Sequence, residues 1–488
     1  MEIKDLKPAL IWNFFDKITQ VPRPSKKEEK IVRFLLDFAE QYGLEAIKDE
    51  ANNVLIKKPA TPGKENLKTL ILQSHIDMVC EKNNDVQFNF ETDPIQTRIE
   101  NGWVKATGTT LGADDGIGIA ASLVILSSKD IEHGPILCLF TAEEETGLNG
   151  AIALQKEFLD GDILINLDSE EWGEFCIGCA GGKSTLGTLT YQKSKIPADY
   201  FWFEVKVSDL KGGHSGCDIH LGLGNANRIL TRYLWSLMQE CQLVIASIDG
   251  GNLHNAIARE AKAIAGVPDA FKEQTRIFLN ILQAQVSEEL AKVDPNVKLS
   301  IQSVEEPKNC IDVKTGNTLI NTLYALPHGV FGMSHDIQGL VETSTNLASV
   351  KMKDDCRIVI TTSQRSSVAS SKIDIANKVT SVFRLAGAEI VSTGGYPGWK
   401  PNPDSEILNI SKTIFEKLFN EKPVITATHG GLECGLFLEK NPALDMISCG
   451  PTILGAHSPD ERIEIETVEK WWELLVELLK EIPRKSFF

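Results

Sequence analysis

Long apolar runs are absent from this chain of 488 residues. None of its hydrophobic stretches approaches the roughly 18 residues that a helix needs to span a bilayer, so we predict no membrane-spanning segment. The first residues, Met1-Glu-Ile-Lys-Asp-Leu-Lys, contain neither an apolar signal core nor a small-residue cleavage site. The sequence therefore predicts a cytoplasmic protein with no membrane partner.

Positive charge is also in short supply. The formal net charge is −17, and most of such a surface would repel the phosphates of a nucleic acid. We therefore expect no nucleic-acid partner. Solubility accounts for most of the acidic excess, but part of it can be concentrated in a pocket where cations neutralise it.

Cysteine is too sparse for a disulfide framework, with ten in the whole chain. Several cysteines stand inside apolar stretches, which indicates buried, reduced thiols. Cys176 and Cys179 form a single Cys-x-x-Cys pair. Neither the second pair of a zinc knob nor the helix start of a thioredoxin-like site stands nearby, so we interpret this pair as structural.

The hydrophobic pattern changes twice along the chain. In residues 1–186, short apolar runs are separated by helical stretches, which is typical of an α/β sheet. Residues 187–392 mix strands and helices without strict alternation, as an α+β domain does. After the turn-rich segment 394–403 the α/β pattern resumes. The sequence thus predicts one α/β domain, residues 1–186 and 393–488, interrupted by an inserted α+β domain, residues 187–392.

Local signals place the first elements. A helix is expected over 8–19, ended by Val-Pro-Arg-Pro, and Ser25 with Glu28 predicts a capping box for a second helix. The clearest strands are residues 69–73, 135–140 and 162–167.

Each of these three strands runs into potential metal ligands. The first ends in His75-Ile-Asp77, the second in Glu144-Glu145-Thr-Gly, and the third in Asp168. Ligands in open α/β sheets gather beyond the carboxyl ends of the strands, so these groups are expected to converge. Two loops add further candidates, Gly112-Ala-Asp114-Asp115-Gly116 and Gly455-Ala-His457.

Capping is the alternative explanation for each carboxylate taken alone, because an Asp or Glu after a strand is more often a helix cap or a solvated turn. A single His is likewise more often structural. Five such segments, most with glycine beside them, are hard to attribute to capping.

In this order, the five segments resemble the metal-site motifs of the co-catalytic zinc peptidase family, which includes carboxypeptidase G, peptidase T and peptidase V. The wording L-Q-S-H-I-D-M-V, L-G-A-D-D-G-I-G, L-D-S-E-E and G-A-H-S-P-D-E-R is closest to the aminoacyl-histidine (Xaa-His) dipeptidase branch. Many family members have a lysine where this chain has Gly116, a difference at the start of a helix that removes no ligand. The resemblance covers essentially the whole chain and implies a zinc-peptidase α/β domain beneath an inserted lid.

The resemblance also implies a role for each motif residue. Asp114 bridges two zinc ions, for which cobalt or manganese can substitute. His75 and Asp168 complete one ion's protein ligands, and Glu145 and His457 complete the other's. The zinc pair polarises the amide and supplies a hydroxide nucleophile. Two further residues are catalytic: Glu144 as general base, and Asp77 as the group that holds the His75 ring.

Charge supports a cation pair. Five carboxylates would face the four positive charges of two zinc ions, and without cations they would repel one another and take up protons. They are Asp77, Asp114, Glu144, Glu145 and Asp168.

Three lid residues are expected to bind substrate by the same resemblance. His214, in Lys-Gly-Gly-His-Ser-Gly, would stabilise the oxyanion, and Asn255 would contact the substrate. Arg365, expected just after a strand at 357–362, would grip the substrate's terminal carboxylate. The alternatives are a histidine in a glycine-rich turn and a surface arginine.

The function expected from these motifs is hydrolysis of dipeptides, with Xaa-His (carnosine-like) peptides as the substrates. Another small-peptide or N-acyl amino acid amidohydrolase on the same fold is the first alternative. A non-catalytic peptide-binding protein is the second, but it would lack a ligand or the base, and all are present. A homodimer is left open.

Overall fold

The computed structural model describes residues 2–485 and divides into two units, which are described separately. The first unit comprises residues 1–178, 401–427 and 432–488, and the second comprises residues 179–400 and 428–431. The boundaries expected from the sequence, 187 and 392, fall inside the second unit. The difference at the first boundary arises because β9 of the second unit already begins at Gly181.

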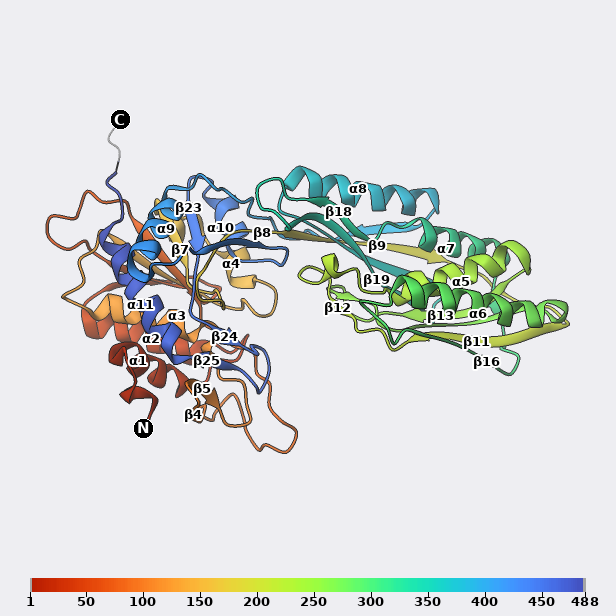
Figure 1. The fold of residues 1–488 in the computed structure, drawn as a ribbon, viewed down its shortest axis with the longest axis horizontal. Helices are drawn as coiled ribbons and strands as arrows, with labels where there is room; N and C mark the ends of the chain where they lie inside the picture. The colour runs from red at the N-terminus through yellow and green to blue at the C-terminus, as the bar shows by residue number, and fades with distance from the viewer. Residues whose placement is uncertain (1, 486–488) are drawn as a thin grey trace. The chain divides into compact units, whose positions relative to one another are not determined.

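The first unit contains an eight-stranded sheet in the order β1-β2-β6-β3-β7-β23-β8-β22. Its strands β7, β8 and β23 are labelled in Figure 1. Its central strands β3, β6, β7 and β23 run parallel. The strands are β1 (Glu45–Lys48), β2 (Val54–Lys58), β3 (Leu70–His75), β6 (Ile136–Thr141), β7 (Ile163–Asn166), β8 (Glu174–Cys179), β22 (Val424–Thr428) and β23 (Asp445–Ser448).

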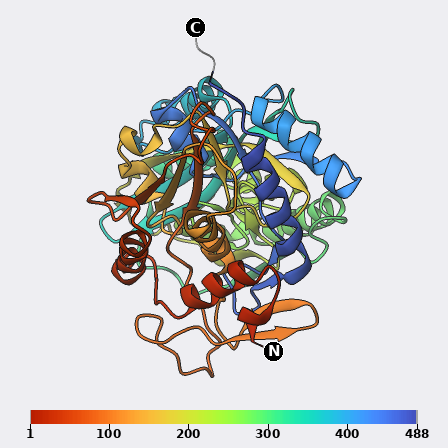
Figure 2. The same cartoon turned by 90° about the vertical axis from the view of Figure 1, so that its left-hand side faces the viewer.

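Helices pack on this sheet, and every residue of β3, β6 and β7 is buried. Helix α3 packs on β3 and β6, and α9 packs on β23 and lies beside α11 (light and dark blue in Figure 2). The helices are α1 (Ala9–Thr19), α2 (Glu29–Tyr42), α3 (Ala113–Ser127), α4 (Asn149–Ala153), α9 (Glu406–Phe419), α10 (Cys434–Lys440) and α11 (Ile465–Lys480).

A smaller sheet in the order β24-β25-β5-β4 completes the first unit. It contains β4 (Thr97–Glu100), β5 (Trp103–Ala106), β24 (Ile453–Leu454) and β25 (Arg462–Glu464). It brings the segment after His457 alongside residues 103–105.

The second unit is built on a nine-stranded antiparallel sheet in the order β16-β11-β15-β13-β19-β20-β9-β21, with β18 paired to β19. These strands are β9 (Gly181–Thr190), β11 (Tyr200–Ser208), β13 (Val244–Gly250), β15 (Ala261–Pro268), β16 (Lys298–Ser303), β18 (Gly329–Met333), β19 (Val341–Lys353), β20 (Arg357–Ser366) and β21 (Glu389–Ser392). Two short pairs accompany it: β10 (Lys193–Ser194) with β17 (Cys310–Ile311), and β12 (Gly213–His214) with β14 (Ala256–Ile257).

Four helices pack on this sheet and form one apolar core with it. They are α5 (Ala226–Glu240), α6 (Lys272–Glu289), α7 (Val313–Ala325) and α8 (Ala369–Leu385) (Figure 1). The combination of an α/β unit with a separate α+β unit is the fold class expected from the sequence.

The strands and helices expected from the sequence all occur within a few residues of their predicted ends, but the capping box is wrong. Helix α2 begins after Glu28, and no side chain caps it. The Ser25 hydroxyl donates instead to Asp77 Oδ2 at 2.7 Å. Glu28 accepts from the backbone N–H groups of Lys26 and Glu143. Both residues therefore serve long-range contacts that a local pattern does not encode.

Two other expectations concern composition. Cys176 and Cys179, which form the Cys-x-x-Cys pair, are both buried. Among residues 2–485, no helix combines the length and apolar character needed to cross a membrane.

A buried histidine in the second unit generates a testable pH dependence. His328 Nδ1 accepts from the backbone N–H of Leu347 at 3.2 Å. Burial and the charge of Arg228 lower the pKa of His328 to about 3 from an ordinary value of 6.5. Below pH 6.5 the unfolded chain therefore takes up a proton that the folded chain does not, so stability falls as pH decreases from 6.5 towards 3.

We predict that His328→Asn, which keeps an acceptor near the Nδ1 position, reduces this loss by up to about 1.4 kcal/mol per pH unit. The free energy of unfolding should be measured from urea titrations between pH 7 and 4.5. The exposed His335→Asn variant is the control and should follow the parent chain. Equal slopes for the parent and His328→Asn would contradict the assignment.

Candidate active site

The parallel strands β3, β6 and β7 end level with one another and bring the first group of side chains together. His75 ends β3 and is paired with Thr141, the last residue of β6. Asp168 follows β7 by two residues. His75 Nε2 lies 2.8 Å from Asp114 Oδ1 and 3.4 Å from Asp168 Oδ1. These three residues form one group of ligand atoms within 4.8 Å of one another.

A second group uses the other oxygen of the same aspartate. His457 Nε2 lies 3.2 Å from Asp114 Oδ2 and 3.1 Å from Glu145 Oε1. Asp114, Glu145 and His457 again lie within 4.8 Å of one another. The Asp114 carboxylate therefore stands between two histidines, with one oxygen towards each.

The local backbone explains how Asp114 reaches this position. Gly112 has φ +72° and ψ +33°, a left-handed conformation that favours glycine, and it caps the start of α3. Asp114 and Asp115 follow with non-helical backbone angles before the regular helix begins. Asp114 is thus held on an irregular turn at the head of an otherwise buried, apolar helix.

Asp77 links both neighbouring glutamates to the strand that carries His75. Its carboxylate accepts from the backbone N–H of Glu144 at 3.0 Å and of Glu145 at 3.2 Å. The Asp77 carboxylate oxygen is 3.5 Å from His75 Nδ1, and the nearer partner of that ring nitrogen is the Asp77 carbonyl at 3.1 Å. Asp77 thus fixes the turn at Glu144 and Glu145 as well as lying against the His75 ring.

Glu144 belongs to a third group of possible ligand atoms, with His75 and Glu145. Desolvation, reinforced by the charges of Asp168, Glu433 and Glu145, raises the pKa of Glu144 well above its ordinary value. A carboxyl group with a raised pKa suits the transfer of protons near neutral pH.

The pKa values of the side chains in this cluster are shifted in different directions. Although burial alone would raise it, hydrogen bonds with His457 and His75 hold the pKa of Asp114 below its ordinary value. Desolvation raises the pKa of Asp168 to about 7. Hydrogen bonds with Asp114 and Glu145 raise that of His457 to about 11. Imidazole nitrogens and carboxylate oxygens are zinc ligands, and the two groups that share Asp114 fit a pair of such cations.

The second unit holds the other three residues expected at a site. Arg365 lies within β20, and the expectation that it follows the strand is wrong because β20 extends to Ser366. Arg365 is 6% exposed, and its Nη1 donates to the Tyr396 hydroxyl at 2.9 Å. Arg365 Nη2 is 3.3 Å from His214 Nε2.

The tautomer of His214 follows from its other nitrogen. Nδ1 accepts from the backbone N–H of Cys217 at 3.1 Å, so the proton of the neutral ring belongs on Nε2. With the proton on Nε2, this nitrogen and Arg365 Nη2 are two donors that lie 3.3 Å apart. Such a pair of donors suits an oxygen acceptor of a ligand.

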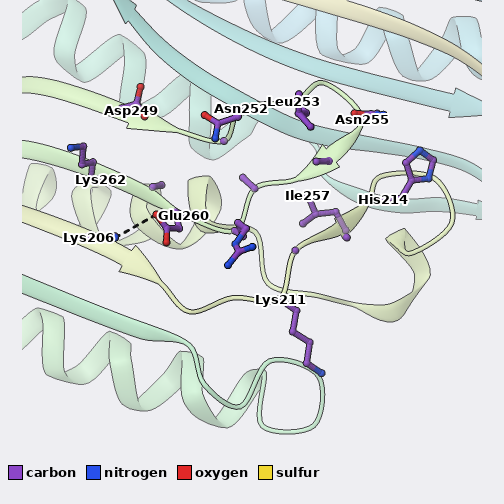
Figure 3. Close-up of a pocket in the computed structure, with 17 residues that line it drawn as sticks. Lys206, Lys211, His214, Asp249, Asn252, Leu253, Asn255, Ile257, Glu260 and Lys262 are labelled. Atoms are coloured by element: carbon purple, nitrogen blue, oxygen red, sulfur yellow. Dashed lines mark ion pairs between the residues drawn. The ribbon is translucent and has the colours of Figure 1, made fainter. Parts of the chain in front are cut away.

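Asn255 and His214 line one cavity of about 780 Å³ in the second unit (Figure 3). The backbone carbonyl of Asn255 accepts from Ser215, next to His214. Basic side chains including Lys211, Arg259 and Lys262 line the same cavity. Among the predicted site residues, the structure therefore joins His214 with Arg365 by a direct contact and with Asn255 by a shared cavity.

A model of peptidase family M20/M25/M40 matches residues 71–481. The chain belongs to this family. The match includes all five segments that carry the candidate ligands, and the predicted peptidase family is confirmed.

Relatives in the M20/M25/M40 family extend over the whole chain. It is 43% identical to the cytosol non-specific dipeptidase of Escherichia coli (strain K12), over 99% of this chain and 100% of the relative. It is also 43% identical to the solved structure of aminoacylhistidine dipeptidase from Vibrio alginolyticus, with a TM-score of 0.92 over 100% of this chain and 99% of that one. A tripeptidase structure from Staphylococcus aureus shares the fold at 17% identity and a TM-score of 0.56, covering 98% and 99%.

Local sequence patterns do not mark two residues at these sites, Glu433 and Tyr396. Glu433 is buried, accepts from Gln73 at 2.7 Å and Thr141 at 2.8 Å, and desolvation raises its pKa to about 8. Tyr396 stands in a segment that predicted only turns. Its partner Arg365 is 31 residues away, so no local spacing marks the pair.

We predict that divalent metal stabilises this family member. A ligand that binds the native state at 100 times its dissociation constant contributes about 2.7 kcal/mol, so zinc should raise Tm and a chelator should lower it. The measurement is calorimetry of the chelated protein with and without added zinc. His457→Gln should reduce the zinc-dependent shift, and the exposed His335→Gln should not. A zinc-independent Tm, or full peptidase activity after exhaustive chelation, would contradict the metal site.

Proposed function

We propose that the protein is a cytoplasmic dipeptidase that acts with two zinc ions. The observation that carries the proposal is the Asp114 carboxylate, whose two oxygens face His75 and His457 separately at 2.8 and 3.2 Å. The two relatives at 43% identity, one named a cytosol non-specific dipeptidase and the other an aminoacylhistidine dipeptidase, support the reaction class.

The proposed ligands divide into two sets that share Asp114. His75 and Asp168 would complete one, and Glu145 and His457 would complete the other. When bound, a zinc pair polarises the substrate carbonyl and lowers the pKa of water. The remaining steps belong to side chains of this chain.

Glu144 is the proposed general base. It would accept a proton from the attacking water on its carboxylate and donate it to the nitrogen of the departing amine, so that the protein ends the cycle unchanged. Asp77 would orient Glu144, because its Oδ1 accepts from the backbone N–H of that residue.

In the second unit, His214 would donate its Nε2–H to the oxyanion that develops on the substrate carbonyl. Arg365 would bind the terminal carboxylate, since a buried guanidinium is suited to a bidentate contact. Asn255 would contact the substrate from the same cavity as His214. We propose Xaa-His peptides as the substrates, and a panel that also contains Xaa-Ala and Xaa-Leu dipeptides tests this choice. Equal rates across the panel would contradict it.

The adjacent glutamates separate the two proposed roles. Glu145→Gln removes a charged ligand and should reduce the zinc content, to about one tightly held ion. Glu144→Gln should keep both ions and lower kcat by roughly a hundred- to ten-thousand-fold, with little change in KM. Zinc per chain and kcat are measured for both variants. Loss of metal from Glu144→Gln alone would reverse the roles, and a loss below tenfold in both would place the active site elsewhere.

A second prediction tests recognition of the substrate carboxylate. Free dipeptides should be cleaved well and their C-terminal amides poorly, because losing a buried charge-assisted contact costs about 2 kcal/mol or more. Arg365→Lys should narrow this difference. Arg276→Gln, which changes a surface arginine of α6 paired with Glu273, is the matched control and should leave this difference unchanged. Equal kcat/KM for acids and amides in the parent chain would contradict the role of Arg365.

A further inference from the structure

A buried glutamate outside the proposed ligand sets binds the turn that carries Asp114. Glu461 is 2% exposed. Its Oε2 accepts from the backbone N–H groups of Leu111 at 2.7 Å and Gly112 at 2.9 Å. Its Oε1 accepts from those of Ala113 at 2.7 Å and Asp114 at 3.3 Å. Four consecutive donors are thus satisfied by one carboxylate, which leaves neither oxygen free to act as a ligand.

The position of Glu461 in the chain shows which segments this contact connects. Glu461 follows His457 by four residues, and its partners lead into Asp114. The carboxylate therefore connects the segment of one proposed ligand to the turn of another. These two ligands are the pair whose side chains meet at 3.2 Å.

A buried arginine makes the matching connection to the third ligand segment. Arg23 is 2% exposed, and its Nη1 donates to the carbonyls of Ile76 at 3.0 Å and Asp77 at 2.7 Å. Its Nη2 donates to the carbonyl of Gly112. Arg23 thus ties the residues after His75 to the same turn that Glu461 holds.

Two glycines make room for this guanidinium. A Cβ atom at Gly112 would lie 2.6 Å from Arg23 Nη2, and one at Gly116 would lie 2.8 Å from it. Gly116 therefore leaves room for the Arg23 guanidinium, at a position where many family members have lysine.

The energetic cost of burying both groups indicates that their bonds matter. A buried charge is tolerated only when it is hydrogen-bonded and its charge is opposed. Backbone groups supply the hydrogen bonds. Burial lowers the pKa of Arg23, and the negative charges of nearby carboxylates, Glu461 first among them, oppose this shift.

We propose that Arg23 and Glu461 are positioning residues that hold the segments of His75, Asp114 and His457 at the spacing needed to bind the two cations. This inference rests on the proposed function. It predicts that disturbing either residue weakens metal binding while every proposed ligand is still present. Outer partners of metal ligands typically change metal affinity by about 10- to 100-fold.

The first test is Glu461→Gln in the full-length chain. The amide offers one acceptor oxygen and turns its NH₂ towards backbone donors, so the Asp114 turn should shift. Zinc affinity, measured by competition with a chromophoric chelator, should fall by about 10- to 100-fold. Glu466→Gln, an exposed glutamate of α11 paired with Lys470, is the matched control and should bind zinc like the parent chain.

A second variant guards against loss of folding. Gly116→Ala changes no charge, and alanine favours a helix over glycine, but its Cβ would displace the Arg23 guanidinium. Zinc affinity should fall at least about tenfold, and circular dichroism of the chelated variant checks that it is folded.

The possible outcomes distinguish the proposed function from the positioning role. A parent chain that binds no zinc would overturn the proposed function. A parent chain that binds two ions, with Glu461→Gln and Gly116→Ala binding them equally tightly, would overturn the positioning role alone. A lower Tm in the chelated Glu461→Gln protein with unchanged zinc affinity would likewise reduce the pair to a structural role.

Discussion

One carboxylate placed between two histidines is the constraint on which the candidate site depends. Asp114 presents its Oδ1 to His75 and its Oδ2 to His457, and these histidines come from segments more than 380 residues apart in sequence. The parallel strands fix His75 and Asp168 because they end level in the sheet. Asp114 and His457 have no such support, since both stand on irregular segments. Their mutual position has to come from hydrogen bonds.

Buried polar side chains supply those bonds. Asp77 holds the turn of Glu144 and Glu145 through two backbone N–H groups, and Glu461 holds the turn of Asp114 through four. Each contact joins segments that are distant in the chain. Buried hydrogen bonds of this kind hold the ligand segments in place, because a partner left unpaired would carry a desolvation cost. Residues whose pKa values are shifted in opposite directions, such as Asp114 and Asp168, can then lie side by side.

The sequence predicts those parts of the fold and site that local patterns encode. An apolar strand that ends at or shortly before a potential ligand can be recognised in the sequence, as at His75, Glu144 and Asp168. The sheet brings these three residues together. Ser25, Tyr396 and Glu461 lacked any such signal. Their partners lie 52, 31 and about 350 residues away, so only the tertiary structure reveals their roles. Ser25 even carried a misleading local signal, because Ser-x-x-Glu also describes a helix cap.

The most direct test of the shared carboxylate is anomalous X-ray scattering at the zinc edge from crystals of the full chain grown with zinc. We predict two peaks per chain, one on each side of Asp114, the first beside His75 and Asp168 and the second beside Glu145 and His457. A single peak, or peaks that leave Asp114 outside the ligands of either ion, would contradict this prediction.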